Sequence, residues 1–499
     1  MSLNTPFAGI PISEVVPEAI AGMNEGLTKS SLLVSRRKIR FQPQTGTSVG
    51  NFTAGTGAGG NIVQFVLADS SSLLDVNSAT ISFTIKSSGT GTETLDDGVA
   101  WCRRMQISLN GNLVEDIDNA HRLTNMEIYG GADKNWYQSA GSYAGFWKLN
   151  PDLAVANPVT STAGLAGATW GAANAATNST LLGNLLQGYN PGFGDVGGQV
   201  PATPTGLWAA AGTRTAAGET RVVPLSIMSG FFRTPQYIPL NLLGEMVISF
   251  TLANAAEALF QATGSTDADY AISDIFMECD VVQPHYLLQE LMNKVATGEG
   301  ENGIVIPYES AIVSQGQAIT NGTSSVIVSR ATNNLRRLLY AHQLTAGLSS
   351  ANFPSVSCFG YNATSNWQVR IGSLYFPSQP ATTDARMFGL LQSAYGEAVN
   401  DRPGLINRSL YTQTTAADGT GGNVRNAFAD AFVVGYNFDS YKNTSGTQVL
   451  DADGVSILGQ AGSQVVVQVT QSGSVTPVIA LVATRYLSLV NGSLKIVGV

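Results

Sequence analysis

The sequence predicts an all-β protein of two tandem domains, and three observations support this prediction. The chain has 499 residues, more than the roughly 250–300 residues at which a single hydrophobic core stops growing. Short runs of alternating apolar and polar residues recur between turns rich in Gly, Asn, Asp, Ser and Thr. One order of segments also occurs twice: a strand pattern, a helical pattern, then a Leu-Gly step before a strongly apolar strand.

Two anchors align the copies of this repeat. Gln106 corresponds to Gln368, and Leu243 corresponds to Leu458. The anchors are 137 residues apart in the first copy and 90 in the second, a difference of 47. We therefore expect a larger insertion in the first domain than in the second. Unrelated antiparallel β-domains would share some such matches, so the anchors alone leave the repeat open.

The first domain is expected to contain seven strand segments and one helix. The strand segments cover residues 38–41, 61–67, 79–85, 105–117, 221–227, 246–252 and 270–282. Asn110-Gly111 is typical of a tight hairpin turn. Leu123, Met126 and Ile128 change to helical spacing, which predicts a helix over 120–129.

The second domain repeats the β pattern after a helical connection. We expect strands over residues 303–308, 325–329, 335–342, 367–376, 429–436, 465–470 and 477–490. Residues 284–296 predict a helix, with Pro284 near its first turn and Gly298 after its end.

Four segments follow from this reading. Residues 1–34 form an N-terminal arm, with a short amphipathic helix indicated by Val16, Ile20 and Met23. Residues 35–283 form the first domain, whose surface insertion at about 144–220 is rich in Ala, Gly, Thr and Asn. Residues 284–300 form the connecting helix, and residues 301–499 form the second domain.

Charge is scarce along the chain. Only 12% of the residues are charged, about half the usual share, and neutral surfaces of this kind suit coverage by neighbouring subunits. The net charge is −9, and the one basic cluster, 36–40, is interpreted as the charged start of an edge strand. Sequence-specific nucleic-acid binding is therefore not expected. The N-terminus lacks a signal-peptide pattern, and no apolar stretch reaches the ~18–20 residues of a membrane span.

Residues that often carry chemistry occur here without the required spacing. Three cysteines without CxxC spacing are expected to be buried free thiols: Cys102, Cys279 and Cys358. Three histidines without metal-ligand spacing are assigned structural roles: His121, His285 and His342. The segment 55–60 is interpreted as a turn, and 451–454 lacks the closing Glu of a calcium loop.

Carboxylate pairs give no acid/base site either. Glu115-Asp116 and Asp96-Asp97 are adjacent, so strand geometry points the members of each pair to opposite faces. We predict no catalytic, cofactor-binding or metal-binding residues, no cofactor and no enzymatic activity.

A longer run resembles a known family. Trp367-Gln-Val-Arg-Ile-Gly-Ser-Leu-Tyr-Phe-Pro-Ser-Gln-Pro380, followed by a helix around 385–395, resembles the second domain of double jelly-roll major capsid proteins. The resemblance is to those of Polinton-like viruses, virophages and related eukaryotic DNA viruses, in which a strand, a "YPxQP"-like turn and a helix recur. Residues 108–117 and 237–244 are similar in outline to the first jelly roll, and 477–499 to the closing strands. The likeness is patchy over 36–499 and is absent from the insertion at about 144–220.

This resemblance implies two eight-stranded jelly rolls in a major capsid protein of an icosahedral virion. It implies a homotrimer with a pseudo-hexameric outline, in contact with neighbouring capsomers and with penton and minor capsid proteins. Insertions at about 144–220 and 400–426 would form an outward tower. The arm 1–34 would lie on the inner side, where it contacts other proteins or an internal membrane. Synthesis would take place in the host cell interior.

Two other readings stay open at this point. A β-sandwich adhesin, or a phage fibre or spike protein, would share the composition and would form an elongated array. A jelly-roll carbohydrate-active enzyme would need converging carboxylates or an aromatic platform. Trp147, Trp170 and Trp208 lie in or beside the insertion, where burial that pins the loop explains them better than a platform does.

Overall fold

The computed structural model describes the β-framework of the chain and the segments close to it. The described residues are 33–44, 52–54, 61–68, 72–87, 93–95, 97–132, 136, 139–146, 219–234, 236–261, 270–286, 289–290, 293, 304–328, 332, 334–345, 348, 356–395, 411–412, 431–438, 464–490 and 493–497. Several predictions lie outside them: the arm helix, most of both insertions, the segments 55–60 and 451–454, Asp96, Leu458, and the three tryptophans of the first insertion.

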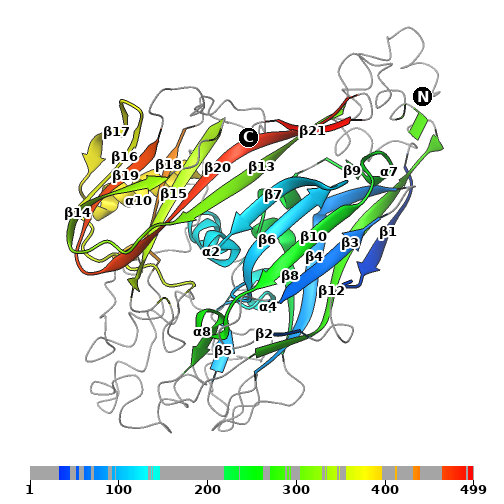
Figure 1. Ribbon diagram of the computed structural model, residues 1–499, viewed down its shortest axis with the longest axis horizontal. Coiled ribbons are helices and arrows are strands. Elements are labelled where there is room, and N and C mark those ends of the chain that lie inside the picture. Colours follow the sequence, from blue (N-terminus) through cyan, green and yellow to red (C-terminus); the bar gives the residue numbers. More distant parts are fainter. Residues whose placement is uncertain are drawn as a thin grey trace.

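Two antiparallel sheets form the first half of the structure, residues 33–284 (Figure 1). Sheet A has the order β1 (Leu33–Phe41), β12 (Tyr270–Pro284), β4 (Leu73–Ser87) and β8 (Glu219–Pro224). The short strands β2 (Phe52–Ala54) and β9 (Ile238–Pro239) pair with β12 and β4. Sheet B has the order β3 (Ile62–Leu67), β10 (Met246–Leu252), β6 (Cys102–Leu109) and β7 (Asn112–Asp118). A small ribbon pairs β5 (Glu93–Leu95) with β11 (Leu259–Gln261).

Two further antiparallel sheets form the second half, residues 304–497. Sheet A′ has the order β13 (Ile304–Gln315), β20 (Val475–Val490), β15 (Leu335–Leu344) and β18 (Val433–Asn437), and β21 (Ser493–Val497) pairs with β20. Sheet B′ has the order β14 (Gly322–Val328), β19 (Val465–Gln471), β16 (Asn366–Ile371) and β17 (Leu374–Ala381).

Strand order is the same in both halves. When the eight principal strands of each half are numbered along the chain, sheets A and A′ both read first, eighth, third, sixth. Sheets B and B′ both read second, seventh, fourth, fifth. This is the connectivity of an eight-stranded jelly roll, a two-sheet arrangement of Greek keys. The predicted fold class, two tandem jelly rolls, is confirmed.

One helix follows the fifth principal strand of each half. These helices are α2 (Ala120–Gly131) after β7 and α10 (Asp384–Ala394) after β17, where helical spacing predicted them. Shorter helical segments are α4 (Ala140–Tyr143), η4 (Leu225–Ile227), η5 (Gly230–Arg233), α7 (Leu240–Leu243) and α8 (Ala255–Ala258). After β12, the described residues 286, 289, 290 and 293 are helical. Within the described residues, no helix has the length and apolar character of a membrane span.

Alternation of apolar residues forms each core. Every second residue of β10 is buried, beginning with Met246, because successive side chains of a strand point to opposite faces. In the first half, the indole of Trp101 lies 5.2 Å from the ring of Phe83 and 5.5 Å from that of Phe250. In the second half, Trp367 of β16 is fully buried.

Turn chemistry explains where strand predictions were right and where they were wrong. Asn110 and Gly111 have φ values of 46° and 77°, so the segment 105–117 is the hairpin that this dipeptide predicted. The segment 367–376 was predicted as one strand but forms two, because Gly372 adopts a φ of 59° and reverses the chain. The predicted strand over 221–227 ends at Pro224, and η4 follows.

Tyr375–Pro380, expected to be a turn, lies within the edge strand β17. Pro377 and Pro380 lack the N–H that a central strand needs, and an edge strand tolerates them. β17 thus stays paired with β16, while the two prolines leave gaps in the row of N–H groups that a further strand would need.

The basic cluster 36–40 lies in an edge strand of the first half. It belongs to β1, at the edge of sheet A, as predicted. Arg36 forms ion pairs with Asp75 at 2.7 Å and with Asp280 at 2.8 Å. Arg40 lies over the ring of Phe276, 3.3 Å from its centroid. These contacts attach the edge strand β1 to β12 and β4, the next two strands of the sheet.

Candidate functional site: a buried charged interface between the jelly rolls

The structure assigns framework positions to the cysteines and histidines. All three cysteines are free and buried, as predicted, and burial raises the pKa of the Cys279 thiol to about 12. His121 lies in α2, His285 follows β12, and His342 lies in β15. Burial lowers the pKa of His342 to about 3, and its Nδ1 lies 3.1 Å from the Tyr340 hydroxyl. No cluster of three or more metal-ligating side chains occurs in the described part of the chain.

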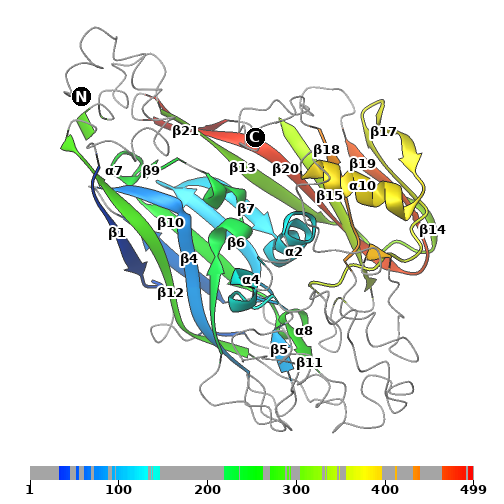
Figure 2. The ribbon, with the colours of Figure 1, turned by 180° about the vertical axis from the view of Figure 1, so that it is seen from behind.

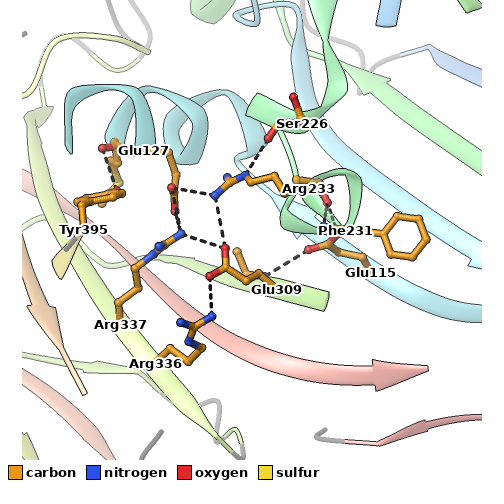
Figure 3. Close-up of polar contacts among 12 residues, drawn as sticks. Glu115, Glu127, Ser226, Phe231, Arg233, Glu309, Arg336, Arg337 and Tyr395 are labelled. Atoms are coloured by element: carbon orange, nitrogen blue, oxygen red, sulfur yellow. Dashed lines mark hydrogen bonds and ion pairs between the residues drawn. The ribbon is translucent and has the colours of Figure 1, made fainter. Parts of the chain in front are cut away.

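A network of charged side chains lies buried where the two jelly rolls meet (Figure 3). Glu127 of α2 and Arg233 of η5 come from the first half. Glu309 of β13 and Arg336 and Arg337 of β15 come from the second half. Residues more than 75 positions apart thus meet in one cluster.

Each carboxylate of the network binds more than one guanidinium. Glu309 lies 3.0 Å from Arg336, 3.3 Å from Arg337 and 3.4 Å from Arg233. Glu127 lies 3.0 Å from Arg337 and 3.4 Å from Arg233. Arg233 and Arg337 therefore each bind both carboxylates, one from their own half and one from the other half.

Burial and ion pairing shift the pKa values of this network in opposite directions. Burial alone would raise the pKa of Glu309, but Arg337, Arg233 and Arg336 outweigh it and hold the pKa below its usual value. Burial alone would lower the pKa of Arg337, but Glu127 and Glu309 outweigh it and raise the pKa. A buried ion pair adds little net stability over an apolar pair, whereas loss of one partner strands a buried charge. The network therefore favours one relative orientation of the jelly rolls.

Glu115 forms a second polar contact across the interface. Its carboxylate accepts a hydrogen bond from the Ala311 N–H of β13 at 3.3 Å and another from the Ser229 hydroxyl. Next to it, the Tyr308 hydroxyl donates to the Val114 carbonyl at 3.0 Å. Burial raises the pKa of Glu115 to about 7, so this carboxyl group titrates near neutral pH.

A third polar contact centres on Arg122 of α2, which is buried. Its Nε donates to the Gln343 side chain of β15 at 2.8 Å, and its guanidinium lies 2.7 Å from Glu257 of α8. Burial would raise the pKa of Glu257, but His121, Arg122 and Arg103 outweigh it and lower the pKa. Arg122 thus connects two elements of the first half to the second half.

Two glycines permit the close approach of the halves. A Cβ on Gly230 would lie 2.5 Å from the Glu309 Cβ and 2.6 Å from its carbonyl oxygen. A Cβ on Gly130 would lie 2.0 Å from a ring carbon of Tyr395. The Tyr395 hydroxyl donates to the Met126 carbonyl at 3.4 Å, which fixes this ring against α2. Side chains at either glycine would push the halves apart.

The interface residues were not singled out from the sequence, apart from one pair. Glu115 and Asp116 do point to opposite faces, as predicted: Glu115 is buried, and Asp116 binds Arg104 on the outer face at 2.6 Å. The adjacent Arg336-Arg337 beside the apolar run 338–341 was an available signal of buried ion pairs. Glu127, Arg233, Arg337 and Glu309 bind one another across the interface, so the arrangement holds two domains together.

Comparison with known proteins adds to this geometry. No protein-family model matches the sequence, and no curated protein matches it. PBCV-1 VP54, fitted into a cryo-EM reconstruction of the virophage Sputnik, is similar at 10% identity with a TM-score of 0.50, over 93% of this chain and 97% of that one. The Faustovirus major capsid protein is similar at 10% identity with a TM-score of 0.50, over 96% of this chain and 98% of that one. The chain therefore has the double jelly-roll fold of these major capsid proteins.

Proposed function

We propose that this chain is a major capsid protein whose trimers, pseudo-hexameric in outline, tile an icosahedral virion shell. The observation that carries the proposal is the pairing of two jelly rolls of identical strand order by a buried charged interface. Three copies of such a rigid pair place six similar domains around one axis, which matches a six-sided tile. Two jelly rolls that moved freely relative to each other would not keep the trimer six-sided.

Composition and domain layout support the same role. Only 12% of the residues are charged, which suits surfaces that neighbours cover. The jelly rolls are proposed to span 35–283 and 301–499, joined by a helix over 284–300; their sheets use residues 33–284 and 304–497. The charged groups of the interface serve to join domains, and we propose that the protein is not an enzyme.

The proposed assembly has further partners. Trimers would contact neighbouring capsomers and penton and minor capsid proteins. The arm 1–34 would lie on the inner side, against such proteins or an internal membrane. The insertions at about 144–220 and 400–426 follow the fifth strand and helix of each half, and we propose that they form the outward tower.

Light scattering coupled to size exclusion tests this function on the full chain. We expect a particle of three times 52.2 kDa and, in negative-stain images, a compact six-lobed outline that assembles into closed shells at high concentration. A monomer at every concentration would overturn the proposal. An elongated array would instead favour the fibre or adhesin reading.

A further inference from the structure

We infer that β17 and α10 of one copy pack against the β1 side of sheet A in a second copy, as β7 and α2 pack against the β13 side of sheet A′ within the chain. The inference rests on the proposed function, because it names the two surfaces through which the trimer closes. It is carried by the shared strand order of the halves and by the exposure of their equivalent elements.

The contact within the chain joins two different surfaces. The first half contributes its fifth strand β7, the helix α2 and η5, and the second half contributes its first strand β13 and its third strand β15. The Val114 carbonyl of β7 accepts a hydrogen bond from the Tyr308 hydroxyl of β13. Glu127 of α2 binds Arg337 of β15 at 3.0 Å. By strand order, the equivalent surfaces are β17 with α10 in the second half and β1 with β4 in the first half.

The first strands of the two halves differ in exposure. Residues 308–312 of β13 are all buried, where β7 and η5 pack against this strand. Residues 35–38 of β1 are all exposed, although β1 has the same edge position in its sheet. The edge of sheet A is therefore open to a partner, whereas the equivalent edge of sheet A′ is covered.

The fifth strands and their helices show the same difference on the other side of the contact. Val114 and Glu115 of β7 are buried, whereas Ala381 is the only buried residue of β17. Leu374 of β17 is 59% exposed, and Tyr375 is 43% exposed. In the same way α2 is buried, and α10 keeps an exposed face. Each element that the contact within the chain uses is buried, and its equivalent in the other half is exposed.

The two exposed surfaces lie at opposite ends of the molecule, as Figures 1 and 2 both show. A chain therefore cannot join its own β17 to its own β1, but a second copy can supply either surface. Repeated contacts between two different surfaces form a ring where the rotation closes. In a ring of three copies, the contact within the chain and the contact between chains alternate around one axis. Six similar domains then make six similar contacts, as the proposed tile requires.

Neither contact requires strands to pair. β7 and β13 belong to different sheets, B and A′, and meet without a shared ladder of hydrogen bonds. Pro377 and Pro380 disfavour pairing of β17 with β1, because both lack an N–H group. No like charges are brought together by β17, which has no charged residue. The ring of Tyr375 instead offers a face to the cations in residues 36–40.

Cross-linking tests which surfaces meet. The chain's own cysteines are all buried, so Ser378→Cys on β17 and Lys38→Cys on β1 introduce accessible thiols at exposed positions. We expect a bis-maleimide to link S378C copies to K38C copies in a reassembled mixture, and the double variant to give species of up to three chains. Each single variant alone should stay unlinked. Ser325→Cys is the matched control and should not link to K38C, because Ser325 is an exposed serine of β14, at the opposite edge of sheet B′.

A bulky label tests whether assembly needs this surface. A polyethylene glycol maleimide attached to S378C monomers should raise the concentration at which half of the chains are trimeric by at least ~10-fold, because the label occupies the place of β1. The same label on S325C should leave that concentration unchanged. Light scattering measures both, and circular dichroism with thermal melting checks that each labelled variant is folded.

Two results would overturn the inference and leave the proposed function standing. One is a trimer in which residues 38 and 378 do not link, and the other is labelled S378C that assembles as well as labelled S325C. Linkage of S378C to itself would also overturn the inference, because like surfaces would then meet. A monomeric wild type would overturn both proposals.

Discussion

The two helices that follow the fifth strands, α2 and α10, occupy equivalent places in the two jelly rolls but have different surroundings. All residues of α2 from Ala120 to Tyr129 are buried. In α10, only Met387, Leu391 and Ala394 are buried. A surface helix normally shows the second pattern, with one apolar stripe toward the core. In the first jelly roll, α2 is thus buried in the interface between the halves, whereas in the second jelly roll α10 keeps one face exposed to solvent.

Polar side chains in α2 are tolerated because each has a partner. The Thr124 hydroxyl donates to the Ala120 carbonyl at 2.8 Å, and the Asn125 side chain donates to the His121 carbonyl at 2.9 Å. Glu127 binds Arg337, and Arg122 binds Glu257. Buried polar groups cost free energy only when they are left unpaired. The comparison shows that one topology can serve an interior or a surface position by changing side chains alone.

The largest effect is expected when the network between the halves loses a carboxylate. Glu309→Gln removes the charge that faces three guanidinium groups, so we expect the free energy of unfolding to fall by ~3–5 kcal/mol. Urea denaturation at neutral pH measures it. Glu278→Gln is the matched control, because Glu278 pairs with Arg40 at the surface at 3.6 Å, and it should cost no more than about 1 kcal/mol. Equal losses in both variants would contradict a special role for the interface.

Glu115 should make the interface sensitive to pH. Its folded pKa of about 7 lies above the ordinary value of 4.5, so the folded state binds this proton more tightly than the unfolded chain does. The stability contributed by this group is complete below about pH 4.5 and is lost as the pH rises through about 7. Glu115→Gln removes this dependence. As the pH rises from 4.5 to 8, the free energy of unfolding of the variant should increase relative to that of wild type by up to about 3 kcal/mol.

Denaturation curves of wild type and Glu115→Gln across this range provide the measurement. The lowered pKa of Glu309 acts in the opposite sense, because its contribution is lost as the pH falls. Comparison of the two proteins cancels that contribution. If the difference in free energy of unfolding between the two proteins stays constant with pH, Glu115 does not have the raised pKa.

One glycine in each helix allows the surroundings of α2 and α10 to be compared by substitution. Gly130 of α2 faces the Tyr395 ring, whereas a Cβ on Gly389 of α10 would meet nothing within 4 Å. We expect Gly130→Ala to lose ~1–3 kcal/mol through overpacking. Gly389→Ala should gain up to ~1 kcal/mol from helix propensity. Thermal melting of the two variants side by side checks the opposite signs, and a loss at both positions would refute the contrast.

The smallest effect concerns how the helices begin. The Thr383 side chain accepts a hydrogen bond from the Arg386 N–H at 3.3 Å and caps α10. Asn119 precedes α2 without capping it, because its side chain binds Arg122. Thr383→Ala should cost about 1 kcal/mol, with exposed Thr382→Ala as the neutral control. Chemical denaturation resolves the two, and no loss from Thr383→Ala would show that the cap is dispensable.

Local patterns in the sequence predicted most of the framework but not the site. Alternation located β10 with its exact ends, and Asn110-Gly111 marked the hairpin, because both signals come from neighbouring residues. The equivalence of Gln106 and Gln368 also holds in the structure, since both lie in the fourth principal strand of their half. The match of Glu309 with Arg233 could not be predicted, because their distance along the chain carries no periodic signal.

The two prolines of β17 have a consequence for how copies of this protein can add to one another. An exposed strand edge with free N–H groups invites further strands without limit, the route to fibrils. Pro377 and Pro380 interrupt that edge at the tip of sheet B′. Growth by strand addition is hindered at this edge of the sheet, which leaves side-chain surfaces to decide how many copies come together there.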